Sequence, residues 1–171
     1  GWHGAGELRA GGTFRGLPAP GVLELTITAQ NGKLDADLFN ALPASPRALW
    51  TMLNPAGSVN LTTRIFWTAA SGQKAVVSLR DVTIFDATVY AKAFPYRMNI
   101  NSAKLSYDPN DPRSAGMQHC EIHALDAEHD GSPITANGWA EVGPDASWQL
   151  HLNDLNATEL KPDDQLRAAL P

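Results

Sequence analysis

The run Val59-Asn60-Leu61-Thr62-Thr63-Arg64-Ile65-Phe66-Trp67 decides the fold class, because apolar and polar side chains alternate along it. Odd-numbered positions are mostly apolar and even-numbered positions mostly polar, which is the period of two of a half-buried β-strand. Residues 23–29 alternate in the same way. The chain is therefore predicted to consist of strands that turn one face toward a core.

Further strand-like runs follow along the chain. They lie at residues 76–80, 82–90, 97–107, 118–124, 134–142 and 147–152. Turn-forming residues separate them at Ser71-Gly72, at 108–112 and at Asp130-Gly131. Short strands at this spacing predict an antiparallel sheet in which neighbours in sequence are neighbours in space.

One region, residues 35–53, breaks the period of two. Its leucines recur at helical spacing, Ser45 is a candidate N-cap, Pro46 suits the first helical position, and residues 54–57 read as a stop signal. We therefore predict an α+β fold that is mostly antiparallel β, a strongly curved sheet with one helical insert packed on one face. Trp50 is expected to pack there with Phe66 and Trp67.

The two ends of the chain resemble each other. Residues 35–43 match residues 163–171 at an offset of 128, and residues 8–14 match residues 134–140 at an offset of 126. The alternating run at 22–25 has a counterpart at 148–152, and the small drift is expected in the turns. We interpret residues 1–171 as a single excised repeat-like domain, with 1–43 and 131–171 as equivalent parts of successive repeat units. The C-terminus is then expected to fray, because its helix would lack a continuation.

Three features together carry a family resemblance: the strand-rich repeat, the helix containing Leu49-Trp50 with the following 53–57 segment, and the run 94–100. With these features the chain resembles the AsmA/TamB-like proteins of bacterial envelopes. The resemblance implies a long curved sheet with an apolar concave face, in a periplasmic protein anchored to the inner membrane. It also implies a role in lipid transport or envelope assembly, adjacent repeat units and lipid as partners, and no catalytic residues.

The segment His119-Cys120-Glu121-Ile122-His123 is the strongest local candidate for chemistry. In a strand, His119, Glu121 and His123 share one face, and two imidazoles with a carboxylate are possible ligands of zinc or iron. Neighbours on one strand face are roughly 6.5 to 7 Å apart, so a further ligand such as His129 or His151 would be needed. The favoured interpretation is a polar, solvent-facing strand side, without a metal or other cofactor.

No catalytic residue is predicted. The sequence lacks a Gly-x-Ser-x-Gly elbow. The paired carboxylates at Asp35 and Asp37, and at Asp163 and Asp164, precede helical patterns, where negative charge favours the helix start. These pairs are therefore interpreted as helix-capping residues.

Composition narrows the function further. The 18 acidic and 13 basic residues give a net charge of −5 and form no basic stripe, which argues against nucleic acid as a partner. The apolar runs are too short for a membrane span, and the single cysteine excludes an internal disulfide. We expect a non-catalytic structural or lipid-groove segment; the alternatives are a carbohydrate- or protein-binding β module and, third, a metal-dependent enzyme that uses the His119 strand.

Overall fold

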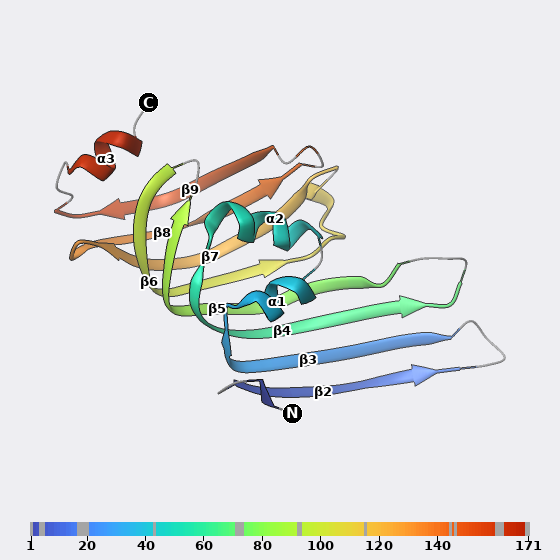
Figure 1. Cartoon of the computed structure of the whole chain (residues 1–171). Helices are drawn as coiled ribbons and strands as arrows, with labels where there is room; N and C mark the ends of the chain where they lie inside the picture. Colours follow the sequence, from blue (N-terminus) through green and yellow to red (C-terminus); the bar gives the residue numbers. More distant parts are fainter. Residues whose placement is uncertain are drawn as a thin grey trace.

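The fold is a single antiparallel sheet of nine strands whose order in space follows their order in the chain (Figure 1). This computed structural model describes residues 2–3, 6–16, 21–42, 44–70, 74–91, 94–114, 116–143, 145, 147–159 and 163–169. The strands are β1 (Trp2–His3), β2 (Gly6–Arg15), β3 (Val22–Lys33), β4 (Ala56–Thr68), β5 (Val76–Ala91), β6 (Phe94–Tyr107), β7 (Gln118–His129), β8 (Ser132–Val142) and β9 (Trp148–Ala157). The predicted antiparallel, mostly β class is confirmed, and the sheet is not closed.

Strand β5 corrects one predicted boundary. The sequence suggested two strands separated at Asp81, whereas β5 runs from Val76 to Ala91 without interruption. The pairing of β5 with β6 shifts register between Leu79 and Val82, so an irregularity accommodates this region inside the strand. The polar residue therefore marks a bulge and not a turn.

Two short helices form the predicted insert between β3 and β4. They are α1 (Ala36–Ala41) and α2 (Ala44–Leu53), and a third helix, α3 (Asp164–Ala169), follows β9. Asp35 is the N-cap of α1, since its Oδ1 accepts a hydrogen bond from the Leu38 amide at 3.0 Å. The predicted cap Ser45 was wrong, because α2 already begins at Ala44. The predicted fraying at Leu170 and Pro171 lies outside the described residues.

The sheet has one face that is apolar from edge to edge. Cross-strand pairing aligns two rows of side chains on this face. The first row is Leu8, Ala29, Leu61, Val82, Leu105, Ile122, Gly138 and Leu152. The second row is Ala10, Ile27, Thr63, Leu79, Tyr107, Cys120, Ala140 and Leu150. We call the side that bears these rows the apolar face and the opposite side the polar face.

The helices cover only part of the apolar face. Its buried cluster consists of Ala87, Val89, Tyr96, Ile100, Ala103, Ala127 and Ile134. Leu53 at the end of α2 packs against this cluster, as does Leu34. Most side chains in the two rows above are only half-buried. The best-packed part of the sheet therefore lies near the helices, and the rows beside it are more open.

The expected packing of Trp50 with Phe66 and Trp67 was wrong in part. Trp50 instead meets Phe39 of α1 edge to face, with ring centroids 5.9 Å apart. Phe66 and Trp67 are adjacent in β4, so their side chains point to opposite faces. Phe66 lies on the polar face and is 38% exposed.

Both edges of the sheet leave apolar side chains in solvent. On β2 and β9 these exposed large residues are Leu8, Phe14, Trp148, Leu150 and Leu155. The accessible surface of 10310 Å² exceeds the about 8,100 Å² that the usual scaling gives for a compact monomer of this mass. The excess is what an open sheet with partly uncovered faces would produce.

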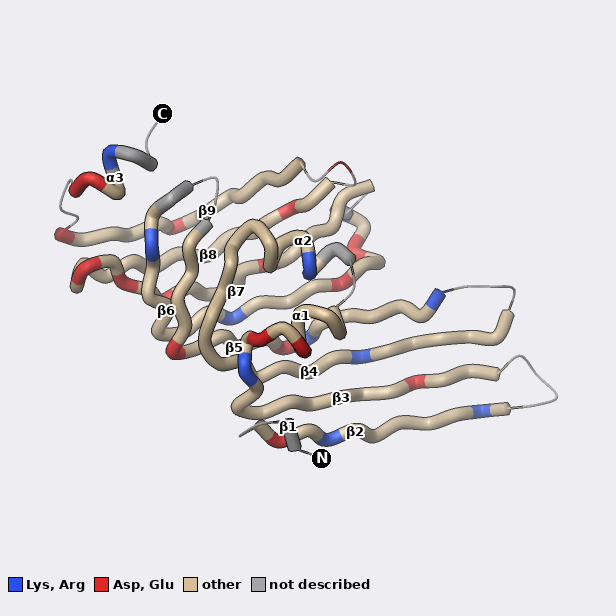
Figure 2. Tube along the Cα trace, in the orientation of Figure 1, with Lys and Arg blue, Asp and Glu red and all other residues tan. Residues whose placement is uncertain are grey.

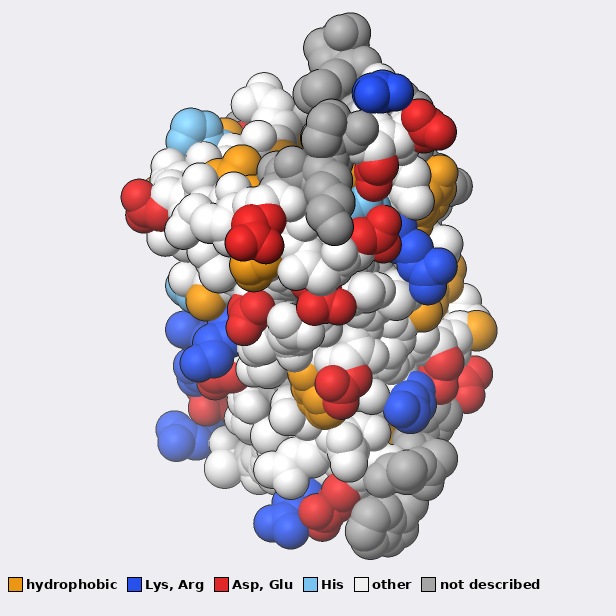
Figure 3. All heavy atoms as spheres, turned by 90° about the vertical axis from the view of Figure 1, so that its left-hand side faces the viewer, with side chains coloured by type: hydrophobic (Ala, Val, Ile, Leu, Met, Phe, Trp, Pro, Cys, Tyr) orange, Lys and Arg blue, Asp and Glu red, His pale blue; other side chains and the backbone are white. Residues whose placement is uncertain are grey.

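Charged residues are scattered over the fold (Figure 2). On the side shown in Figure 3, acidic and basic side chains alternate with neutral ones, and the hydrophobic atoms form separate small spots. Within the described part of the chain, no helix has the length and apolar character needed to cross a membrane.

Candidate functional sites

His119 lies on the polar face between two carboxylates. It is 4% exposed, its Nδ1 is 2.9 Å from Oε1 of Glu141 on β8, and its Nε2 is 3.1 Å from Oε1 of Glu121. Glu121 also forms an ion pair with Arg113, which in turn pairs with Asp111 at 2.7 Å. The five side chains form a continuous row of charge-assisted hydrogen bonds.

The row favours the charged forms of His119 and Glu121. Burial by itself lowers the pKa of His119, but the hydrogen bonds to Glu141 and Glu121 outweigh it, so the pKa of this imidazole is raised. Burial raises the pKa of Glu121, yet the hydrogen bonds from His119 and Arg113 reverse this effect and lower it. The contacts therefore describe an imidazolium held by carboxylates.

The three metal-ligand candidates on β7 make different contacts. His119 and Glu121, which were predicted to share a strand face, are within hydrogen-bond distance, whereas exposed His123 shares a hydrogen bond of 2.8 Å with the hydroxyl of Ser106. Both nitrogens of His119 already face separate carboxylates. The suggested helper His129 lies at the other end of β7. The observed arrangement is an ion-pair row running across the strands.

The indole of Trp139 lies between two imidazoles. Its ring centroid is 5.7 Å from that of His119 and 5.3 Å from that of His151, with which it stacks at an interplanar angle of 11°. The pairing accounts for this column, because Trp139 lies opposite Glu121 on one side and His151 on the other. Sequence reasoning did not find the column, since it depends on the register of three strands.

A second histidine cluster lies where β7 ends. His129 is 5% exposed and stacks on Tyr96 with ring centroids 3.9 Å apart. Its Nδ1 donates to the carbonyl oxygen of Arg97 at 2.6 Å, and its Nε2 is 2.7 Å from Oδ2 of Asp163. Oδ2 of Asp130 is 3.8 Å from Nε2 of His129. The sequence analysis named His129 as a helper ligand and Asp163 as a helix-opening acid, and it did not predict their contact.

Electrostatics support an ion pair in this cluster. Burial lowers the pKa of His129, but the hydrogen bonds to Asp163 and to the Arg97 carbonyl, together with the nearby Asp130, raise it overall. His129, Asp130 and Asp163 each offer one possible metal-ligand atom, and these atoms lie within 4.8 Å of one another. Among the described residues this is the only such group. They are close enough for a shared cation, but the hydrogen bonds observed are those of an imidazolium between oxygen acceptors.

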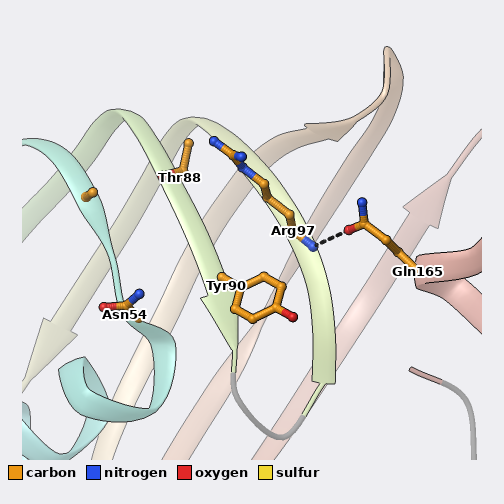
Figure 4. A pocket seen from close by; sticks show the side chains of 6 residues that line it. Asn54, Thr88, Tyr90, Arg97 and Gln165 are labelled. Carbon is orange, nitrogen blue, oxygen red and sulfur yellow. Dashed lines mark hydrogen bonds between the residues drawn. The ribbon is translucent and has the colours of Figure 1, made fainter. Parts of the chain in front are cut away.

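An open hollow of about 480 Å³ lies beside this cluster (Figure 4). Its lining is Asn54, Ala56, Thr88, Tyr90, Arg97 and Gln165. The Arg97 side chain extends toward Thr88, while the Arg97 backbone N–H donates to Oε1 of Gln165 at 3.4 Å. Five of its six lining residues carry polar groups, and the hollow is open to solvent, unlike the enclosed apolar pockets that bind small ligands.

Cys120 is a poor nucleophile in this environment. Burial raises the pKa of its thiol to about 12, so the thiolate is scarce at neutral pH. Its side chain belongs to the apolar face, opposite to its neighbours His119 and Glu121.

Comparison with known proteins adds no relative: no protein-family model matches the chain, and neither curated proteins nor solved structures gave a match.

Proposed function

We propose that this chain is a non-catalytic structural segment of a large AsmA/TamB-like protein of the bacterial envelope, facing the periplasm. In this proposal the strongly curved sheet offers its apolar face as a groove for the acyl chains of lipids, and so contributes to lipid transport or envelope assembly. One observation carries the proposal: the apolar face continues across eight strands, and the helices cover only part of it.

The open rows have the chemistry that an acyl chain requires. Ile27, Leu61, Val82 and Leu105 belong to these rows, and each is half-buried although its strand is paired on both sides. Large contiguous apolar surfaces are unfavourable in water and commonly mark an interaction site. An acyl chain lying across the rows would bury this area without demanding any specific polar contact.

Contacts between distant strands support a concave shape. Helix α2 contacts both β5 and β8, which are separated in the sheet by β6 and β7. A sheet that bends around the helix would allow both contacts. Figure 1 shows β5 and β6 bending at one end, next to the helices.

Strand registers support the repeat organisation. His3 pairs with Gly6 in the β1–β2 hairpin, and His129 pairs with Ser132, each residue 126 positions later, in the β7–β8 hairpin. One strand further on, Leu8 pairs with Ala29, and the equivalent pair is Ile134 and Ala157. Leu8 and Ile134 are thus 126 positions apart, whereas their partners Ala29 and Ala157 are 128 positions apart. The sequence matches show the same two offsets.

The drift between these offsets has a local cause. The pairing of β8 with β9 shifts register between Thr135 and Asn137, and Asp154 on β9 has a φ of 47°. One of the extra residues therefore lies in a β-bulge, and the turn between the strands takes up the other. Units of this kind would add to the sheet in series, so neighbouring units are the expected partners of β9 and of the part of β2 that β1 leaves unpaired.

Titration with a fluorescent fatty acid tests the groove. Ile27→Asn places a polar group on the apolar face, whereas its matched control Thr28→Asn changes the adjacent residue on the polar face. We expect the unmodified protein and the control to bind the probe and Ile27→Asn to bind at least several-fold more weakly. Absence of binding to the unmodified protein, together with no lipid in its native mass spectrum, would contradict the proposal.

A further inference from the structure

Two side chains form hydrogen bonds with the backbone of Arg97, in the part of β6 that extends beyond its pairing with β7. At this end the pairing of β6 with β7 stops at Asn99 and Glu128, while β6 extends further, to Phe94. The Arg97 carbonyl accepts from His129, and its N–H donates to Gln165 of α3. Side chains thus replace the missing strand and bring the start of α3 against β6.

His129 links this sheet end directly to the helix start. Its second nitrogen contacts Asp163, the residue before α3, whose carbonyl accepts the first helical hydrogen bond from the Arg167 amide at 3.1 Å. An imidazole donating from both nitrogens connects a strand-end carbonyl and a helix-start carboxylate at once. Its position is therefore suited to fix where the helix begins.

The same two residue types recur at the equivalent positions. The offsets that relate the two hairpins and the two helix starts place His3 at the position of His129 and Asp35 at that of Asp163. Gly4 occupies the position equivalent to Asp130. The histidine and the capping aspartate recur, whereas the third acidic residue does not, which favours an ion pair over a cation site as the repeated element.

We propose that this His–Asp pair is the joint between successive units. The histidine ending the last strand of one unit holds the aspartate that opens the helical insert of the next unit. The partner surface is thus a strand end that receives a helix start preceded by an aspartate. This inference rests on the proposed repeat organisation and not on lipid binding.

The joint gives each helical insert a fixed position over the apolar face. The side chains around His129 are Tyr96, stacked on its ring, and the carboxylates of Asp130 and Asp163; β6 contributes the Arg97 carbonyl. Two carboxylates and a carbonyl oxygen around one buried ring stabilise its charged form. His129 is a positioning residue, because it acts on the helix through Asp163.

Asp163→Asn tests the joint, and Asp164→Asn is the matched control one position later. NMR titration of the histidines and ¹⁵N relaxation of the α3 amides are the readouts. With Asp163→Asn we expect the pKa of His129 to fall and the α3 order parameters to drop from about 0.85 to below about 0.6. Asp164→Asn removes only a solvent-exposed ion pair with Arg167 and should change both readouts very little. An unchanged α3 in Asp163→Asn would overturn the proposal.

A double-mutant cycle with His3→Gln and Asp35→Asn tests the recurrence. Asparagine keeps a capping oxygen for the Leu38 amide, so this change removes mainly the charge. We expect the shifts of the urea midpoint to be non-additive, and additive shifts would overturn the recurrence.

Two further measurements distinguish the joint from a cation site and from the lipid groove. If Zn²⁺ raises the midpoint of the unmodified protein and Asp130→Asn abolishes this effect, the cluster is a cation site and the joint proposal is wrong. Fatty-acid binding retained in Asp163→Asn, alongside a loosened α3, would establish the joint independently of the groove.

Discussion

Asn31 and Glu159 adopt the same left-handed backbone conformation, each with a φ of 58°, although they are 128 positions apart in the sequence. Asn31 lies at the irregularity between β3 and β4, and Glu159 follows β9. Asparagine tolerates this conformation, whereas glutamate rarely adopts it. The shared geometry is therefore a property of the position, and Glu159 is strained in it.

Replacement of Glu159 by glycine is expected to stabilise the protein. Glycine adopts positive φ without steric cost, so we expect a gain of about 0.5–1 kcal/mol in the free energy of unfolding, measured by urea denaturation. Glu24→Gly provides the control, because Glu24 lies inside β3, where glycine should cost about 0.5–1 kcal/mol. Equal destabilisation by both changes would show that the strain at Glu159 is absent.

Gly138→Ala is expected to destabilise the protein strongly. A Cβ at this position would lie 1.9 Å from the carbonyl oxygen of His151, and Gly138 has a φ of 153°. Strand β8 would have to separate from β9, at an expected cost of roughly 2–4 kcal/mol. Gly11→Ala on β2 is the matched control, since a Cβ there has no neighbour within 4 Å and should shift the unfolding midpoint very little.

The row around His119 predicts a maximum of stability in mildly acidic solution. The pKa of His119 is raised above its ordinary 6.5, so its contribution is complete below about pH 6.5 and is lost as pH rises through the folded-state pKa. The pKa of Glu121 is lowered from 4.5, so its contribution is present above about pH 4.5 and is lost as pH falls through the folded-state value. Both contributions are therefore complete between these limits.

His119→Gln should reduce the unfolding free energy by about 1–3 kcal/mol at pH 5.5, because a buried charged hydrogen-bond partner is lost. The difference from the unmodified protein should be smaller at pH 8.5, because this contribution is lost as pH rises through the folded-state pKa. Urea denaturation at the two pH values measures this. His123→Gln is the control on the same strand face, and its exposed side chain should have a small effect at both values.

Cys120 should react slowly with a disulfide reagent in the folded protein. A pKa of about 12 leaves on the order of 10³ times less thiolate at pH 8 than an ordinary cysteine has. We expect the absorbance trace to be slow in buffer and fast in 8 M urea. Rapid reaction in buffer would show that the thiol is not held in the apolar face.

The sequence predicted which strands and helices form better than it predicted where each of them begins and ends. Alternation along residues 59–67 identified β4, and helical spacing with a capping aspartate identified α1. The same reasoning divided β5 at Asp81 and moved the start of α2 past Ala44. The first error lies where pairing with the neighbouring strands, and not the local residues, decides whether the strand continues.

Candidate sites were less predictable than elements. The shared face of His119 and Glu121 follows from strand periodicity and was anticipated. The contact of His119 with Glu141 was not, and neither was the stacking of Trp139 between two imidazoles. Each requires knowledge of which residue lies opposite which, and alternation within one strand carries no such information.

The sequence by itself determined that strands dominate, which residues share a side of each strand, and that two segments of the chain resemble each other. These are local properties, because the backbone of an extended strand fixes the direction of every second side chain. Only the tertiary structure decided the partners across the strands, since bulges shift the register one residue at a time. It thereby aligned separate apolar residues into continuous rows, and it brought His129 to Asp163 across 34 positions of sequence.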